Sequence, residues 1–205
     1  MSPVILAIDQ GSSASRCVAL DAGLRPLALA SRPLASAFPE PGRVEHDPAQ
    51  ITAGVLGSLR DALRQAGADW ADVAAIGLAA QTETFVVWDR ATGEPVYPAV
   101  SWRDGRAGDL CARLRTAGHE RRVRELTGLP LESAFSAPKL AWLLAEVPGA
   151  RVRAAAGELA FGDVNCWLTW QLSGGAAHVT EPSMAARTML FDLRAGDWSA
   201  ELLDL

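Results

Sequence analysis

The chain has 205 residues, of which 49% are hydrophobic and 21% are charged, and its formal net charge is −5 with a sequence pI of about 5.2. This composition supports a hydrophobic core and excludes an intrinsically disordered protein. An acidic chain without a stripe of basic residues is a poor candidate for nucleic-acid binding, and no apolar run is long enough to span a membrane.

The N-terminus and the cysteines both favour a cytoplasmic protein. The stretch MSPVILAIDQG has no basic segment before its apolar residues, which excludes a secretory signal peptide. Cys17, Cys111 and Cys166 are far apart and form no CxxC pair, as expected of a reducing compartment.

Three short apolar runs open the chain, at residues 4–8, 16–21 and 27–32, and predict an antiparallel β-meander. Residues 38–48 (FPEPGRVEHDP) contain three prolines and one glycine and predict a loop. A helix then begins after Asp47, the N-cap candidate, with Pro48 in its first position and Gln50 at the spacing of a capping box. Its apolar face is formed by residues at helical spacing: Ile51, Val55, Leu59, Ala62 and Leu63.

Strands and helices alternate in the rest of the chain. Residues 73–81 (VAAIGLAAQ) predict a strand covered on both faces, and residues 84–89 predict a second strand followed by a turn. Further helices are expected within residues 103–143, with a start at Ser136, and at 163–172, where Asp163 is a helix N-cap; strands are expected at 158–163 and 188–193. The sequence therefore predicts an α/β fold with a mixed sheet.

The stretch AIDQGSSASRCVAL, residues 7–20, places an acid, a glycine and short hydroxyls at the point where the chain reverses. Gly11 can adopt a positive φ and allow close approach of a ligand, and successive N–H groups with Ser12 and Ser13 form an anion nest. A carboxylate such as Asp9 repels a phosphate unless Mg²⁺ lies between them, which favours a Mg²⁺-nucleotide. The alternative is an ordinary Gly/Ser hairpin in which Asp9 accepts hydrogen bonds from turn amides.

Common motifs of other enzyme classes are absent from the sequence. It has no glycine–lysine P-loop, no GxG, and no GxSxG nucleophile elbow. His119–Glu120 begins like a zinc helix, but Val123 stands where the second histidine belongs. The P-loop, dinucleotide, serine-hydrolase and zinc-hydrolase interpretations are therefore weak.

Several separated motifs resemble the FGGY carbohydrate kinases, and among them the glycerol kinases most closely. They are DQGSSASR, PGRVEHDP, AAIGLAAQTETFVVWDRATGEPVYPAVSWRDGR, GLPLESAFSAPKLAWLL, GELAFGDVNCWLTWQLSGG and HVTEPSMAARTMLFDL, in that order and over nearly the whole chain. The resemblance implies a ribonuclease-H/actin-like fold with helices on both faces of the sheet. It also implies ATP and Mg²⁺ as cofactors and phosphorylation of one hydroxyl of a small polyol or sugar.

The resemblance also assigns residues to the cofactors. The hairpin acid and hydroxyls of the family match Asp9, Ser12 and Ser13, and the hairpin arginine matches Arg16. Together with Gly11 these residues are expected to bind the nucleotide phosphates, with Asp9 facing the metal.

The substrate residues implied by the resemblance are Gln81, Thr82, Glu83, Trp102 and Ala134. Two of them depart from the family pattern, because Thr82 replaces an arginine and Ala134 replaces a tyrosine. We therefore expect a pocket that is roomier and less cationic than that of a glycerol kinase. The alternatives are that Trp102 is a plain core residue and that Glu83 caps a turn.

The catalytic base of the family, an aspartate in a GD-type motif, would lie beyond Leu205, so no catalytic residue is assigned in this chain. The closing stretch DWSAELLDL lacks a C-terminal cap, and we expect residues 1–205 to be an N-terminal kinase domain without its C-terminal end or the second domain. The fragment alone is expected to be inactive. A non-catalytic sugar- or phosphate-binding domain derived from such a kinase stays as the alternative, and self-association into a homo-oligomer stays open.

Overall fold

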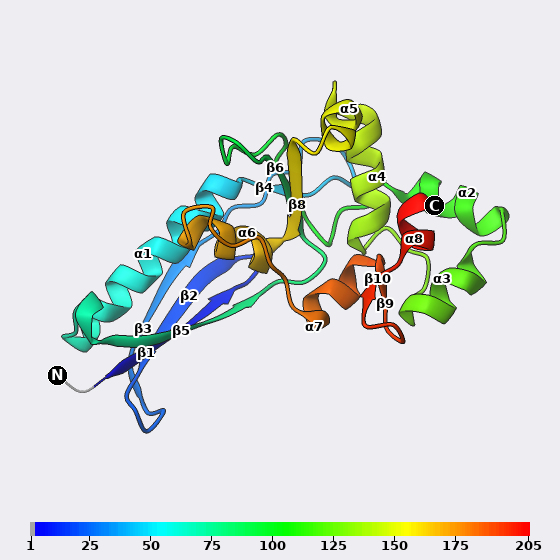
Figure 1. Ribbon diagram of the computed structural model, residues 1–205. Helices are drawn as coiled ribbons and strands as arrows, with labels where there is room; N and C mark the ends of the chain where they lie inside the picture. The colour runs from blue at the N-terminus through cyan, green and yellow to red at the C-terminus, as the bar shows by residue number, and fades with distance from the viewer. Residues whose placement is uncertain (1–2) are drawn as a thin grey trace. The chain divides into compact units, whose positions relative to one another are not determined.

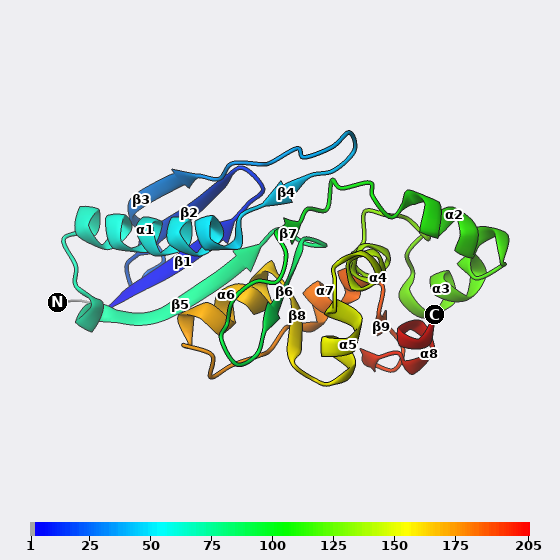
Figure 2. The same ribbon diagram turned by 90° about the horizontal axis from the view of Figure 1, so that it is seen from above.

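An antiparallel meander opens the chain in the computed structural model, which describes residues 3–205. Its strands are β1 (Val4–Gln10), β2 (Ala14–Leu20) and β3 (Pro26–Pro33). A fourth strand, β5 (Val73–Ala80), pairs with β1 in parallel, so the strand order is β3-β2-β1-β5 (Figures 1 and 2). The predicted N-terminal meander and mixed sheet are confirmed.

Helix α1 (Pro48–Ala66) lies along this sheet and contacts β1, β2 and β3 (Figure 1). The five apolar residues predicted for its inner face are all buried. The Asp47 carboxylate accepts a hydrogen bond from the N–H of Ala49 at 2.8 Å, which confirms the N-cap. Gln50 does not complete a capping box, because its Oε1 accepts from the N–H of Ala35 at 3.0 Å instead.

The polypeptide forms two structural units. Unit 1 contains the described residues up to Ser36 together with His46–Gln81, and unit 2 contains Ala37–Glu45 and Thr82–Leu205. Unit 1 therefore holds the meander, α1, β5 and a short 3₁₀ helix, η1 (Trp70–Asp72). Each unit is described separately below.

A second sheet has the order β4-β7-β6-β8, and all of its residues except His46 belong to unit 2. Its strands are β4 (Glu45–His46), β7 (Ala99–Val100), β6 (Phe85–Asp89) and β8 (Leu159–Asp163), and the β6–β8 pair is antiparallel. The segment 38–48, which was expected to be loop, thus contains the two-residue strand β4. Figure 1 shows α4 and α5 beside β8.

The remaining elements of unit 2 are mostly short helices. They are α2 (Gly108–Thr116), α3 (Glu120–Thr127), α4 (Ser136–Glu146), α5 (Ala150–Ala155), α6 (Val164–Leu172), α7 (Pro182–Ala185), η2 (Ala186–Thr188), β9 (Phe191–Asp192), β10 (Asp197–Trp198) and α8 (Ala200–Asp204). The last predicted strand, residues 188–193, is reduced to the two residues of β9. Asp163 caps α6 as predicted, since its Oδ1 accepts from the N–H of Cys166 at 2.8 Å.

Two hydrophobic clusters stabilise unit 2. One joins α2 and α3 to the C-terminal segment through residues such as Val123, Leu131 and Leu190. The other packs Leu143 of α4 against Phe85 and other residues of the second sheet. Among residues 3–205, no helix has both the length and the apolar character required to cross a bilayer.

Strand β5 differs from its prediction in one respect. The sequence VAAIGLAA forms a strand as expected, but residues 74–77 are exposed rather than covered on both faces. In the described sheet β5 is an edge strand, visible at one margin in Figure 2. Its apolar side chains are consequently available to a further layer or strand.

Candidate functional site

The polar hairpin between β1 and β2 brings the predicted phosphate-binding residues together in unit 1. The N–H of Gly11 donates to the carbonyl of Ala14 at 3.0 Å and closes the turn. Ser12 donates through Oγ to Oε1 of Gln81 at 3.0 Å. Ser13 is exposed, and its hydroxyl has no hydrogen-bond partner within residues 3–205.

Asp9 and Arg16 lie directly opposite each other in the β1–β2 ladder. Nη1 of Arg16 is 3.0 Å from Oδ2 of Asp9, and the two side chains are 45% and 59% exposed. A pair this exposed contributes little to stability. Both charges are therefore accessible to a ligand at the tip of the hairpin.

Gly11 does not adopt the positive φ that the sequence suggested, because its backbone lies outside the left-handed region. A Cβ at this position would come no closer than 3.5 Å to Ala14 O, which is an ordinary contact. Neither conformation nor packing within the described chain requires glycine here. The missing side chain leaves the backbone of the turn open to a partner from outside.

Gln81 lies with the hairpin and not with the other predicted substrate residues of unit 2. Its N–H donates to the carbonyl of Gln10 at 2.8 Å, and its side chain contacts Ser12 and the carbonyl of Gly11. Gln10 is itself fully buried and accepts a hydrogen bond from Ser15. Gln81 and Gln10 thus hold the hairpin in place through hydrogen bonds to its residues.

Glu83 is the centre of a second group of polar residues, which belongs to unit 2. Its backbone has a φ of +61°, a left-handed conformation that is uncommon for a residue other than glycine. Ser136 Oγ donates to its carbonyl at 3.0 Å, and Thr82 Oγ1 donates to its Oε2. These bonds keep the carboxylate, which is largely buried, in one place.

Arg187 places a cation beside Glu83. Its Nε donates to Oε1 of Glu83 at 2.6 Å, and its guanidinium carbon lies 5.0 Å from the centre of the Phe135 ring. The expectation of a roomier and less cationic pocket than that of a glycerol kinase stays a prediction, although Arg187 places one cation beside Glu83. Sequence reasoning missed Arg187 because 104 residues separate it from Glu83 and no periodic pattern connects the two.

Trp102 and Ala134 belong to the same group. The N–H of Trp102 donates to Oγ1 of Thr84 at 3.0 Å, next to Glu83 in the chain. The Trp102 side chain is 43% exposed, so the alternative of a core residue is wrong. Ala134 precedes Phe135 and accepts a hydrogen bond through its carbonyl from Lys139 at 2.7 Å. Hydrogen bonds thus connect Thr82 with Glu83 and, through Thr84, with Trp102, while Lys139 connects Ala134 with Ser101, the residue before Trp102.

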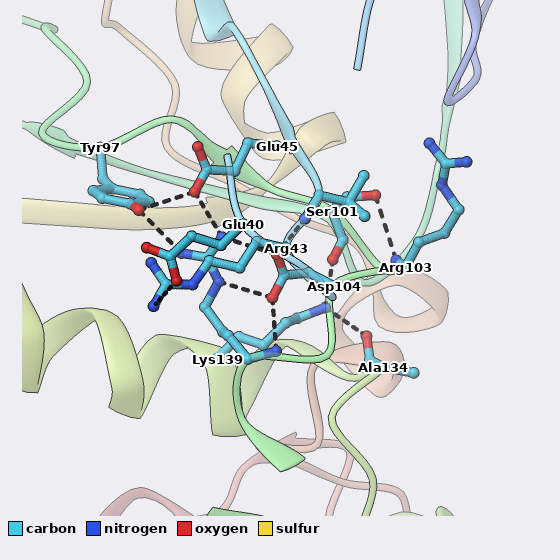
Figure 3. Close-up of polar contacts among 11 residues, drawn as sticks. Glu40, Arg43, Glu45, Tyr97, Ser101, Arg103, Asp104, Ala134 and Lys139 are labelled. Atoms are coloured by element: carbon cyan, nitrogen blue, oxygen red, sulfur yellow. Dashed lines mark hydrogen bonds and ion pairs between the residues drawn. The ribbon is translucent and has the colours of Figure 1, made fainter. Parts of the chain in front are cut away.

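A buried ionic cluster supports this group (Figure 3). Arg106 is paired with Asp104 at 2.8 Å and with Glu45 at 2.6 Å, and all three side chains are at least nine-tenths buried. Tyr97 OH donates to Glu45 at 2.9 Å, and the guanidinium of Arg106 lies over the Trp142 ring at 4.5 Å. Burial would raise the pKa of Asp104, but the hydrogen bonds from Arg106 and from the N–H of Val44 hold it below its usual value.

The hairpin residues fit a phosphate group better than they fit a metal ion. Within the described part of the chain, no three His, Cys, Asp or Glu side chains come together as a metal site. A Mg²⁺ ion at Asp9 would therefore have one protein carboxylate and take its other ligands from phosphate oxygens and water, which is a common mode for this ion. The open turn at Gly11 and the hydroxyl of Ser13 fit a phosphate group.

Comparison with known proteins identifies relatives along the whole chain. Residues 4–205 match the description "FGGY family of carbohydrate kinases, N-terminal domain". A protein named glycerol kinase from Paracidovorax citrulli is 50% identical over 201 residues, and one from Polaromonas naphthalenivorans is 49% identical over 201 residues. Each alignment covers 98% of this chain but 40% of the relative.

Solved structures show the same relationship. The crystal structure of Plasmodium falciparum glycerol kinase with ADP has a TM-score of 0.92 at 26% identity, covering 99% of this chain and 40% of that one. Gluconate kinase from Lactobacillus acidophilus has a TM-score of 0.88 at 22% identity, covering 100% of this chain and 39% of that chain, and shows a shared fold. The chain thus spans about two fifths of the length of the relatives it matches.

Proposed function

Because the chain belongs to the FGGY family of carbohydrate kinases, we propose that it forms the N-terminal part of an ATP-dependent kinase that phosphorylates a hydroxyl of a small polyol or sugar. In this proposal the hairpin of unit 1 binds the nucleotide phosphates, and the Glu83 group of unit 2 binds the acceptor. When bound, Mg²⁺ supplies positive charge to the transferring phosphoryl group.

The observation that carries the proposal is the open hairpin tip. Asp9 and Arg16 are exposed, the Ser13 hydroxyl is unpaired within the described chain, and glycine at position 11 has no use in the fold itself. This combination suits a phosphate with its metal and gives a simple hairpin no advantage. The kinship with proteins named glycerol kinase supports the same interpretation.

The size of the acceptor compound is a more specific part of the proposal. Glu83 can accept hydrogen bonds from hydroxyls, Arg187 can donate them, and the exposed Trp102 can pack against a carbon chain. Ala134 leaves space where the family resemblance implies a tyrosine. We therefore propose a polyol or sugar of about four to six carbons, since glycerol would leave contacts unmade and be positioned less well.

The test requires the parts that this chain does not span. A chimera would join residues 1–205 to the section of the Paracidovorax citrulli relative that follows the matched region. ADP release would be measured for the chimera and for the 205-residue chain alone, with glycerol and with alditols, pentoses and hexoses. We expect substrate-dependent turnover from the chimera and none from the chain alone, because we propose that the base and the adenine site lie outside it.

The specificity is tested in the same chimera. Thr82→Arg combined with Ala134→Tyr should shift kcat/KM toward glycerol, and the two changes need not be additive because they share one site. A wild-type chimera that prefers glycerol over every larger compound would overturn the size argument. A folded chimera with no turnover on any compound would overturn the kinase proposal and favour the non-catalytic binding domain.

A further inference from the structure

The chain contains a single lysine, Lys139, and 18 arginines. Apart from histidine, every exposed basic side chain is therefore an arginine, and the one lysine is completely buried in α4. Arginine and lysine are not equivalent, because the ammonium group is a compact charge with three donors whereas the guanidinium is a large planar fork. The buried position 139 thus differs in its chemistry from every exposed cation of the arginine type.

Lys139 connects two segments that carry proposed substrate residues. Its Nζ donates to the carbonyl of Ser101 at 2.9 Å and to the carbonyl of Ala134 at 2.7 Å. Figure 3 shows the side chain extending from α4 to these two loops. Ser101 immediately precedes Trp102, so one ammonium group binds the backbone of both the Trp102 segment and the Ala134 segment.

Burial and nearby charges set the protonation of Lys139. The groups that face it are Glu83, Asp104 and Arg106 from the loops next to β6 and β7, and the Cys111 thiol from α2. Asp104 and Glu83 attract the ammonium, but burial is the larger effect and lowers the pKa of Lys139 to about 7. The charge that binds the two carbonyls thus changes within the neutral range.

We propose that Lys139 is a positioning residue of the substrate site, whose ammonium group fixes the Trp102 segment relative to Ala134. The inference rests on the proposed function, because Trp102 and Ala134 contact an acceptor only in that proposal. Deprotonation of Lys139 removes the positive charge from two short hydrogen bonds. It also leaves the negative charges of Asp104 and Glu83 with one fewer cation nearby. Acceptor affinity should accordingly fall as the pH rises through the pKa of Lys139.

The first experiment needs no substrate. ¹⁵N-lysine labelling of the 205-residue chain gives one side-chain signal. In a sample that is also labelled with ¹⁵N-tryptophan, the indole ¹⁵N–H of Trp102 is assigned by its loss in Trp102→Phe. We expect the Trp102 signal to shift with the same midpoint as Lys139, and to lose this shift in Lys139→Met. The matched control is Leu143→Ala, which also truncates a fully buried α4 side chain but removes no hydrogen bond to Ser101 or Ala134.

A Trp102 signal with no transition at the Lys139 midpoint, or the same transition in Lys139→Met, would overturn the positioning role. Both Lys139→Met and Leu143→Ala should lower the melting temperature, so a general loss of stability would affect the two variants alike. The Leu143→Ala signal should keep its pH dependence. This first experiment tests whether Lys139 positions the Trp102 segment, and its outcome does not depend on the chain being part of a kinase.

The second experiment uses the chimera and its best acceptor. Lys139→Met should raise KM by about tenfold or more with a smaller change in kcat, whereas Leu143→Ala should leave KM unchanged. In the wild type KM should rise between about pH 6 and about pH 8.5, and in Lys139→Met it should not. An unchanged KM in Lys139→Met would overturn the substrate role, whereas an inactive wild-type chimera would overturn the proposed function.

Discussion

At the residue scale, the exposed Asp9–Arg16 pair can be tested against an ion pair in the turn of the neighbouring hairpin. Asp21 and Arg25, between β2 and β3, are joined at 3.0 Å, the same distance as Asp9 and Arg16. Both are surface ion pairs on a hairpin, but only Asp9 lies at the proposed phosphate site. The comparison separates the loss of a surface pair from the loss of a functional carboxylate.

In the chimera, Asp9→Asn should reduce kcat by about 10²-fold or more while the acceptor Kd stays nearly constant, because Asp9 is proposed to act through the metal and the phosphates. Asp21→Asn should leave both quantities almost unchanged. Steady-state kinetics and calorimetric acceptor binding measure the two effects. A large rise in acceptor Kd at unchanged kcat would assign Asp9 to the acceptor site or to the fold.

The buried cluster around Arg106 allows a second comparison of residues. Arg106 and Arg43 both lie over the Trp142 ring, at 4.5 and 5.0 Å, but Arg106 pairs with buried acids and Arg43 with the exposed Glu40. Arg106→Met leaves Glu45 and Asp104 without their cation and should cost about 3–5 kcal/mol of unfolding free energy. Arg43→Met should cost less than about 1 kcal/mol, and urea titrations of both variants measure the difference. Equal losses would mean that the contact with Trp142, and not charge burial, dominates.

At the element scale, the parts of the fold that sequence could predict are those with local, periodic signals. Helix α1 combines a cap, a proline at its start and an apolar stripe, and β1–β3 are short apolar runs separated by turns. The short helices α5, α7 and α8 carry too few residues for a periodic pattern, and the expected strand at 188–193 is interrupted where Met189 takes a φ of +67°.

Only part of the candidate site could likewise be predicted from the sequence. The hairpin residues are contiguous, so a motif could identify them together. Arg187 and Lys139 were not predicted as site residues, because their roles come from contacts with residues far away in the chain. The sequence also could not show that Gln81 and Thr82, which are neighbours in the chain, fall in different units. Ser136 was predicted to start a helix and does so, but its hydroxyl binds Glu83 O and does not cap α4.

Strand β5 carries a prediction about association. Its exposed segment includes Ile76, which is 45% accessible on an edge strand that has no charged residue. An apolar edge of this kind favours pairing between chains, and a charge on it opposes pairing. We expect the 205-residue chain to associate with rising concentration and Ile76→Lys to reduce this without lowering the melting temperature. Sedimentation velocity measures the change, and equal association of both proteins would exclude β5 as the contact.

At the scale of the whole molecule, Lys139 links stability to pH. Its pKa is about 7 in the folded chain, below the ordinary value of 10.5, so between these values the unfolded chain binds more protons. The free energy of unfolding should therefore rise with pH above 7, by up to about 1.4 kcal/mol per pH unit. Burial raises the pKa of the Cys17, Cys111 and Cys166 thiols above the ordinary 9.0, which has the opposite effect at higher pH.

The useful window for this measurement is consequently about pH 7 to 8.5, before the thiols of the unfolded chain ionise. Urea unfolding of the wild type should show the rise, and Lys139→Met should show a flatter dependence in the same window. A wild type whose stability falls over this range would mean that Lys139 keeps a pKa close to its ordinary value.

Because the chain contains one lysine, cleavage at that lysine can measure how often the folded structure opens. An endoproteinase that cleaves only after lysine has one target bond here, between Lys139 and Leu140, and that bond lies inside α4. Cleavage requires at least this helix to unfold, because a protease cannot accommodate a helical substrate. The appearance of the fragments 1–139 and 140–205 would measure the population of opened molecules directly. A polyol that binds the closed form would slow that cut, so proteolysis could identify acceptors from a compound collection before any catalysis is observed.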